Sequence, residues 1–214
     1  MKKFSSLLVM LALALALGFV LAGCESALSE PETVGAQTYL NTGGDAFVEY
    51  NGNLTVEMQS GNSSIRVGQI VDGKLTLELP QNVTPLNTWA TGLTVSPSET
   101  RILTRSSFDL KDGNGADFGY LMYRYDIWGE NTDIEERLNQ FWFVYCSNGC
   151  TVSGTTSREW NGVTITQEYR ITAKQGWNYI YHKGERKSPT TFLRIITTDI
   201  SSAPKEMKWS ITPY

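Results

Sequence analysis

The chain has 214 residues, of which 41% are hydrophobic and 19% are charged, and its formal net charge is −4. This size fits one medium domain, and the composition excludes both a disordered chain and one that spans a membrane throughout. The weak negative charge argues against nucleic acid as a partner, because phosphate binding needs a clustered positive field.

Residues 1–23 have the order of a bacterial export signal. Lys2 and Lys3 give a positive start, and Leu7–Val20 is a nearly unbroken apolar run that is shorter than the roughly 20 residues of a membrane-spanning helix. The next residues, Leu21-Ala22-Gly23-Cys24, resemble the lipobox of bacterial lipoproteins. This resemblance implies cleavage before Cys24 and a diacylglycerol on its sulfur, which anchors the mature protein to a membrane of the cell envelope.

The residues after Cys24 are predicted to form a tether. Glu25 stands where an Asp favours inner-membrane retention in some bacteria, so the outer membrane is the preferred location. The segment up to Asp45 is rich in Ser, Glu, Pro, Thr, Gly and Asn and has no sustained periodicity. We therefore predict a lipidated flexible tether over 24–45 and one folded domain over 46–214. This mature chain has 16 basic and 22 acidic residues.

The first part of the domain has the period-2 pattern of half-buried strands. Leu54, Val56 and Met58 alternate with polar residues, and so do the leucines of Lys74–Leu79. Asp72-Gly73 is a preferred two-residue hairpin turn between that strand and Ser64–Val71. The following segment, Pro80–Pro97, has no clear alternation and three prolines, which predicts a linker within a single folded unit.

Asp112, Asn114 and Asp117 give the sequence its one stretch with the look of a cation loop. Oxygen ligands separated by Gly suit calcium, but the positions of an EF-hand that need Gly and a bidentate Glu hold Asp117 and Tyr123. A solvated Gly-rich hairpin turn explains the same residues, so we predict no cofactor and keep calcium as a weak alternative.

Aromatic residues give the main indication of binding. In the predicted strand Tyr120–Trp128, alternation places Tyr120, Arg124 and Trp128 on one face. An outward face that combines rings with a guanidinium suits stacking on a glycan or contact with a protein partner. These three residues are therefore the candidate ligand-binding site.

The rest of the chain contains further strand patterns and two cysteines. Asp133–Asn139 is predicted as a helical turn, and Asn161-Gly162 as another hairpin turn. Cys146 and Cys150 flank three residues that end in Gly, which suits a hairpin with the two cysteines opposite one another. Because an exported protein meets an oxidising compartment, a Cys146–Cys150 disulfide is predicted. The remaining predicted strands are Gln140–Cys146, Val163–Ile171, Trp177–His182, Thr191–Thr197 and Lys208–Thr212.

Consecutive strands with short connections predict an all-β fold. We favour an antiparallel β-sandwich, with a closed lipocalin-like β-barrel as the alternative, because this many strands must hide their edges. Residues Gly68–Pro80 and Lys174–Tyr181 resemble the small β-sandwich lipoproteins of host-associated and gut bacteria.

No catalytic constellation stands out in the sequence. The single histidine, His182, lies in a strand pattern where a solvent-facing position is expected, and no G-x-S-x-G motif is present. The acidic residues Asp126, Asp133, Glu135 and Glu136 leave a surface hydrolase as an alternative. The favoured hypothesis is a non-catalytic, membrane-anchored binding module for a protein or glycan, and a barrel that carries an apolar ligand is a further alternative.

Overall fold

The computed structural model describes residues 31–41, 47–60, 63–85, 87–125, 127–128 and 135–214. The described residues form sixteen strands and no helix, which confirms the all-β prediction. The strands are β1 Val34–Asn41, β2 Phe47–Glu49, β3 Leu54–Ser60, β4 Ser63–Val71, β5 Lys74–Leu77, β6 Thr94–Ser96, β7 Ile102–Arg105, β8 Phe108–Lys111, β9 Asp117–Arg124, β10 Ile127–Trp128, β11 Glu135–Cys146, β12 Cys150–Trp160, β13 Val163–Ala173, β14 Gly176–Ser188, β15 Thr191–Thr197 and β16 Lys208–Pro213.

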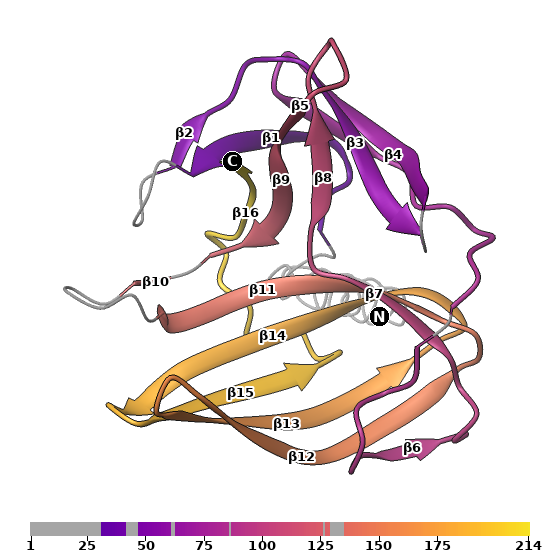
Figure 1. The fold of residues 1–214 in the computed structure, drawn as a ribbon, viewed down its shortest axis with the longest axis vertical. Coiled ribbons are helices and arrows are strands. Elements are labelled where there is room, and N and C mark those ends of the chain that lie inside the picture. The colour runs from indigo at the N-terminus through magenta and orange to yellow at the C-terminus, as the bar shows by residue number, and fades with distance from the viewer. Residues whose placement is uncertain (1–30, 42–46, 61–62, 86, 126, 129–134) are drawn as a thin grey trace, which may run out of the picture.

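Seven strands close into a barrel in the order β16-β1-β5-β4-β3-β8-β9 (Figure 1). The C-terminal strand β16 makes the closure, because it pairs with β1 on one side and with β9 on the other. The β1–β16 pair is parallel, with Thr38 opposite Trp209. A closed barrel has no free edge along this path, which removes the edges that an open sheet would expose.

The barrel interior follows directly from the alternation in its strands. Leu54, Val56 and Met58 of β3 point inward and are buried, as are Leu75 and Leu77 of β5. Further inward side chains come from the other strands of the closure, and they include Phe108, Leu110, Leu121, Trp209 and Ile211. The barrel is therefore filled by its own side chains.

The closed barrel is nearer to the alternative architecture of the sequence analysis than to the favoured antiparallel β-sandwich. Hydrogen bonding between β16 and β9 closes the strands on themselves, which two stacked open sheets would not show. Two of the strand pairs, β1–β16 and β13–β15, are also parallel. Both pairs join strands that are not consecutive in the chain, so local turn signals gave no sign of them.

Strand β2 pairs with β1 at the barrel, and the other strands form a second sheet in the order β11-β14-β15-β13-β12-β6, with β7 and β10 also paired to β11. The second sheet is joined to the barrel where Gln140 of β11 pairs with Arg124 of β9. Figure 1 shows it below the barrel, with β11 and β14 nearer the barrel and β12 farther away. Ile102 of β7 and Val152 of β12 lie in one apolar cluster although they belong to opposite ends of the sheet. The second sheet therefore curls around an interior of its own.

Both predicted hairpin turns are present. Asp72 and Gly73 have φ of 47° and 74°, and Asn161 and Gly162 have φ of 49° and 75°. Positive φ at both central residues is the geometry that these dipeptides favour. The segment from Pro80 to Pro97 passes from the barrel to the second sheet, and the Trp177 indole donates to the Pro80 carbonyl at 2.8 Å.

Two boundaries differ from the sequence prediction. Residues 34–41, expected in the flexible tether of 24–45, form β1 between β5 and β16, because their pairing partners lie far along the chain. The helical turn expected over Asp133–Asn139 is wrong for its described part, since β11 begins at Glu135 and pairs with β14 from Arg137 onward.

Candidate functional site

Strand β11 lies between the barrel and the interior of the second sheet and has apolar contacts on both faces. The candidate site lies on the face that is turned toward the second sheet. On the barrel side, Phe143 belongs to the barrel core and meets the Phe108 ring edge-on at a centroid distance of 5.1 Å. On the opposite side, Val144 and Cys146 belong to the interior cluster of the second sheet. Successive residues of a strand point to opposite faces, so one strand lines both interiors.

A cavity of about 140 Å³ opens into the second sheet beside that cluster. Its walls come from β7, β11, β13, β14 and β15 and from the segment before β6. We call this cavity the tryptophan pocket. It is lined by Trp89, Ala90, Ile102, Thr104, Trp142, Val144, Tyr169, Ile180, His182 and Ile196.

Strand register explains why these side chains converge. In the ladder between β11 and β14, Trp142 is opposite Ile180, and in the ladder between β14 and β15, His182 is opposite Ile196. Residues opposite one another share a face of the sheet, so the ladder extends one apolar surface across three strands. Trp89 reaches this surface from a segment that is held at Asn87, whose backbone exchanges two hydrogen bonds with Ile102.

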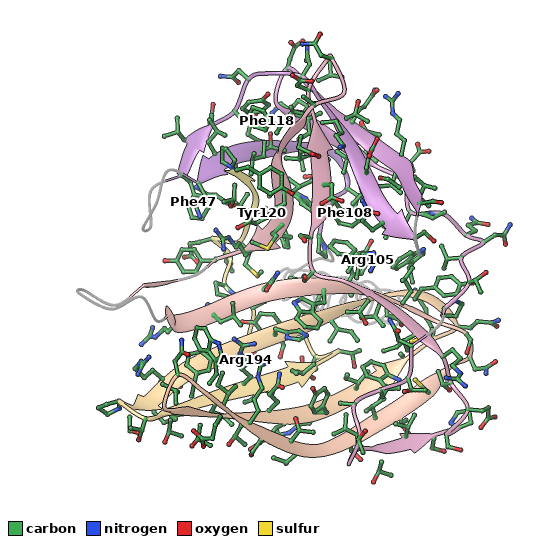
Figure 2. The ribbon with its side chains drawn as sticks, viewed as in Figure 1. Phe47, Arg105, Phe108, Phe118, Tyr120 and Arg194 are labelled. Atoms are coloured by element: carbon green, nitrogen blue, oxygen red, sulfur yellow. The ribbon has the colours of Figure 1, made fainter. Side chains whose placement is uncertain are left out.

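His182 is the buried polar residue of the tryptophan pocket. Its imidazole is 1% exposed and stacks on the Trp142 ring at a centroid distance of 3.9 Å. Burial, and secondarily the positive charge of Arg194, lowers the pKa of His182 to about 3. Figure 2 shows Arg194 in the second sheet. The imidazole is therefore neutral at physiological pH and is a weak base.

Three of the side chains that line the pocket have a buried nitrogen for which the described residues supply no partner. These are the indole nitrogens of Trp89 and Trp142 and Nδ1 of His182. A buried polar group without a hydrogen bond costs about 1–3 kcal/mol relative to a satisfied one. A concave and mostly apolar cavity is the usual form of a small-molecule site.

The residues predicted for ligand binding do not form one exposed face. Tyr120 lies on β9 in the barrel, where its ring is 6.2 Å from that of Tyr214 (Figure 2). Arg124 shares its side of β9 but is only 8% exposed, and its guanidinium donates to Thr212 at 3.5 Å. Trp128 belongs to the separate strand β10, because β9 ends at Arg124, and its side chain lies outside the described part.

Cys146 and Cys150 are free, buried cysteines in the structure, so the predicted disulfide is absent from it. The hairpin on which that prediction rested is not formed. Cys146 pairs with Gly176 of β14, whereas Cys150 pairs with Ala173 of β13. Burial, and secondarily contact with Cys150, raises the pKa of the Cys146 thiol to about 12, so Cys146 is protonated at physiological pH.

In the loop at Asp112, the carboxylates of Asp112 and Asp117 make contacts with other groups of the protein. The Asp112 carboxylate accepts hydrogen bonds from the backbone of Asn114 and Ala116 at 2.8 and 2.9 Å. These hydrogen bonds hold the pKa of Asp112 below its usual range. Asp117 forms an ion pair with Lys111. Within the described ranges, no three His, Cys, Asp or Glu residues are grouped so that they could hold a metal ion.

The residues considered for catalysis are the histidine and four acidic residues. His182 is buried, where a solvent-facing position was expected, because it lies on the inner face of β14 opposite Ile196. Asp126 and Asp133 lie outside the described residues, as do the leader and Cys24. The side chains of Glu135 and Glu136 are not described either.

Sequence reasoning missed the tryptophan pocket, although part of the signal was present. Alternation within Gln140–Cys146 already places Trp142 and Val144 on one face, and the same holds for Ile180 and His182. The missing information was the pairing of β11 with β14, which brings the two faces together. No local pattern marks Trp89, which lies in an irregular segment.

The described part of the chain contains no helix with the length and apolar character needed to cross a membrane. Comparisons of the chain with models of protein families, with curated proteins and with solved structures found no match.

Proposed function

We propose that this chain is a bacterial envelope lipoprotein whose folded part is a non-catalytic binding module, and that the tryptophan pocket is its ligand site. The observation that carries the binding role is the cavity of about 140 Å³ and its lining of aromatic and aliphatic side chains. The export signal and the lipobox at Cys24 support the anchoring.

Two features support a binding role over a catalytic one. The only histidine has a pKa of about 3, which makes it a poor general base near neutral pH. The imidazole of His182 also stacks on the Trp142 ring, which holds it against an apolar surface. Ligand binding in such a pocket requires only shape, apolar area and a few polar contacts.

The chain between the lipid and the barrel is short. The Glu32 carbonyl accepts a hydrogen bond from the Trp209 indole at 2.7 Å, and the Thr33 carbonyl accepts one from Leu77 at 2.7 Å. The chain is thus fixed to the barrel from Glu32 onward. The segment 25–31 spans at most about 25 Å when fully extended. The binding module therefore works close to the membrane surface, most favourably that of the outer membrane.

Mass spectrometry of the protein from membranes of a lipoprotein-processing bacterium tests the anchoring. We expect a mature N-terminus at Cys24 that carries diacylglycerol, and we expect Cys24→Ser to keep the leader. A free thiol at Cys24 in the processed protein would contradict the proposal.

Thermal unfolding in the presence of toluene tests the binding role. A ligand that binds only the folded state stabilises it, and this stabilisation grows with the logarithm of ligand concentration above the dissociation constant. We therefore expect the melting temperature to rise with toluene concentration. Ile180→Phe fills the pocket and should abolish the rise, whereas Val71→Phe at an exposed position should keep it. If Ile180→Phe does not fold, Val144→Ile serves as the smaller pocket-filling change. A response that both pocket variants retain would contradict binding at this site.

A further inference from the structure

One wall of the tryptophan pocket differs from the others in how it is held. All of the lining residues except Trp89 and Ala90 belong to strands, whose ladders fix their backbones. Those two residues come from the irregular segment 88–92, which we call the strap. Within the described part of the chain, no backbone hydrogen bond joins the strap to a strand. The strap is therefore the wall that can move without breaking a ladder.

The strap is fixed at both of its ends. Before it, the backbone of Asn87 exchanges hydrogen bonds of 2.8 and 3.1 Å with Ile102. After it, Leu93 packs against the interior cluster of the second sheet, and Thr94 begins the β6 ladder opposite Ser153. Motion is therefore confined to a few residues between two fixed points, which is the form of a hinged loop.

The strap has one buried contact and free space beside it. Trp89 packs against the interior cluster of the second sheet, whereas Ala90, Thr91 and Gly92 are exposed. A second hollow, of about 390 Å³, lies along residues 88–100, and Trp89 and Ala90 line this hollow as well as the tryptophan pocket. The strap therefore has room to move away from the pocket.

Gly92 sets the backbone conformation of the strap. Its φ is 89°, a value that other residues rarely adopt, and no atom lies within 4 Å of a Cβ placed there. Alanine at position 92 would strain the strap without a steric clash. Because no ladder holds residue 92 at this φ, displacement of the strap would release that strain.

We propose that the strap is the gate of the tryptophan pocket: it moves away to admit a ligand and returns so that Trp89 closes over the ligand. This inference rests on the proposed binding function and adds the route by which the ligand enters and leaves. A ligand passes only while the strap is open, so the opening limits both association and dissociation.

Exchange of fluorobenzene, followed by ¹⁹F relaxation dispersion, tests the gate. The protein is the chain 24–214 with Cys24→Ser, which retains every described strand, and a titration gives Kd. Gly92→Ala should raise the association and dissociation rate constants about tenfold each, because only the closed strap requires the left-handed φ that is costly for alanine. Kd should change less than about twofold, since the strap is closed in both the free and the bound state.

A matched control separates the gate from a general loosening of the fold. Gly115 also has a positive φ, of 82°, and open space around a Cβ, but it lies in the loop at Asp112. Gly115→Ala should leave both rate constants unchanged. Leu93→Ala is a second variant of the strap, because it removes an apolar anchor that does not line the pocket. It should raise both rate constants.

The outcomes distinguish the gate from the binding function. If Gly92→Ala and Leu93→Ala both leave the rate constants unchanged, the strap is a fixed wall and the proposal is wrong, while the pocket remains a binding site. An equal increase in Gly115→Ala would also contradict the gate. If fluorobenzene does not bind the unaltered chain, the proposed function fails, and the gate fails with it.

Discussion

His182 shows how one buried side chain links packing to pH dependence. Its neutral imidazole stacks on Trp142, and its pKa falls from 6.5 to about 3 because burial disfavours the charged form. Between these values the unfolded chain binds a proton that the folded chain does not bind. Stability is therefore full above pH 6.5 and decreases as the pH falls toward 3.

His182→Phe should remove this part of the pH dependence. Phenylalanine keeps a ring against Trp142 but does not titrate. We expect the free energy of unfolding of the unaltered protein to fall by about 1–2 kcal/mol more than that of the variant between pH 7 and pH 5. Urea denaturation at both pH values measures this difference, and identical pH profiles for the two proteins would show that His182 is not buried as described.

Cys146 and Cys150 give a second residue-scale prediction. Because both cysteines are buried, and burial raises the pKa of the Cys146 thiol to about 12, iodoacetamide at pH 8 should reach neither cysteine in the folded protein. It should modify both after unfolding. Mass spectrometry counts the added groups. Two unmodified cysteines after unfolding without reductant would instead indicate the disulfide that the sequence favoured.

At all three residues, the sequence indicated the chemistry of the side chain more clearly than its surroundings in the fold. The spacing of Cys146 and Cys150 suited a hairpin, but the strands that contain them pair with β14 and β13. His182 has a tyrosine before it and a lysine after it, which leaves its face undetermined from the sequence alone. Burial of a strand residue depends on which strand lies opposite, and that information is nonlocal.

At the scale of elements, the contact between β9 and β16 closes the barrel. Gly119 permits this contact, because a Cβ there would lie 2.2 Å from the Thr212 carbonyl oxygen on β16. Backbone atoms of a paired strand have little freedom to move away. The close approach of β9 and β16 is therefore best accommodated by glycine at this position.

Gly119→Ala should destabilise the protein by about 1–3 kcal/mol, the usual cost of an added methyl in a packed position. Gly113→Ala is the matched control, because no atom lies within 4 Å of a Cβ there, and it should change stability by less than about 0.5 kcal/mol. Chemical denaturation of both variants gives the comparison. Equal effects at the two sites would contradict the close β9–β16 approach.

The elements differ in how far the sequence could predict them. Strands β3, β4 and β5 follow from alternation and the Asp72-Gly73 turn, because neighbouring strands joined by a tight turn pair with each other. Strand β1 has an interrupted pattern, with Gly35 and Gln37 among its residues, and its partners β5 and β16 are distant in the chain. Such pairs become evident only in the assembled barrel.

At the scale of the whole molecule, β11 and β14 form a layer shared by the barrel and the second sheet. Phe143 packs in the barrel core against Phe108 and Trp209, and its neighbour Val144 packs in the second sheet. Strand β11 therefore covers the interior of the barrel on one face and the interior of the second sheet on the other. If β11 were displaced, both interiors would be exposed. This sharing predicts that they unfold together.

Phe143→Ala should lower the free energy of unfolding by about 3–5 kcal/mol while the protein keeps a single transition. Within each protein, tryptophan fluorescence and far-ultraviolet circular dichroism should give the same midpoint, and the midpoint of the variant should be the lower one. Separate midpoints in the two signals would mean that the barrel and the second sheet unfold independently.

The central claim is that the second sheet, and not the filled barrel, contains the binding cavity. A crystal of the mature protein under xenon pressure tests it most directly, because xenon occupies apolar cavities of this size. We expect a xenon atom in contact with Trp142, Ile180 and Ile196. Xenon inside the barrel, with side chains filling the space between Trp142 and Ile180, would contradict the account.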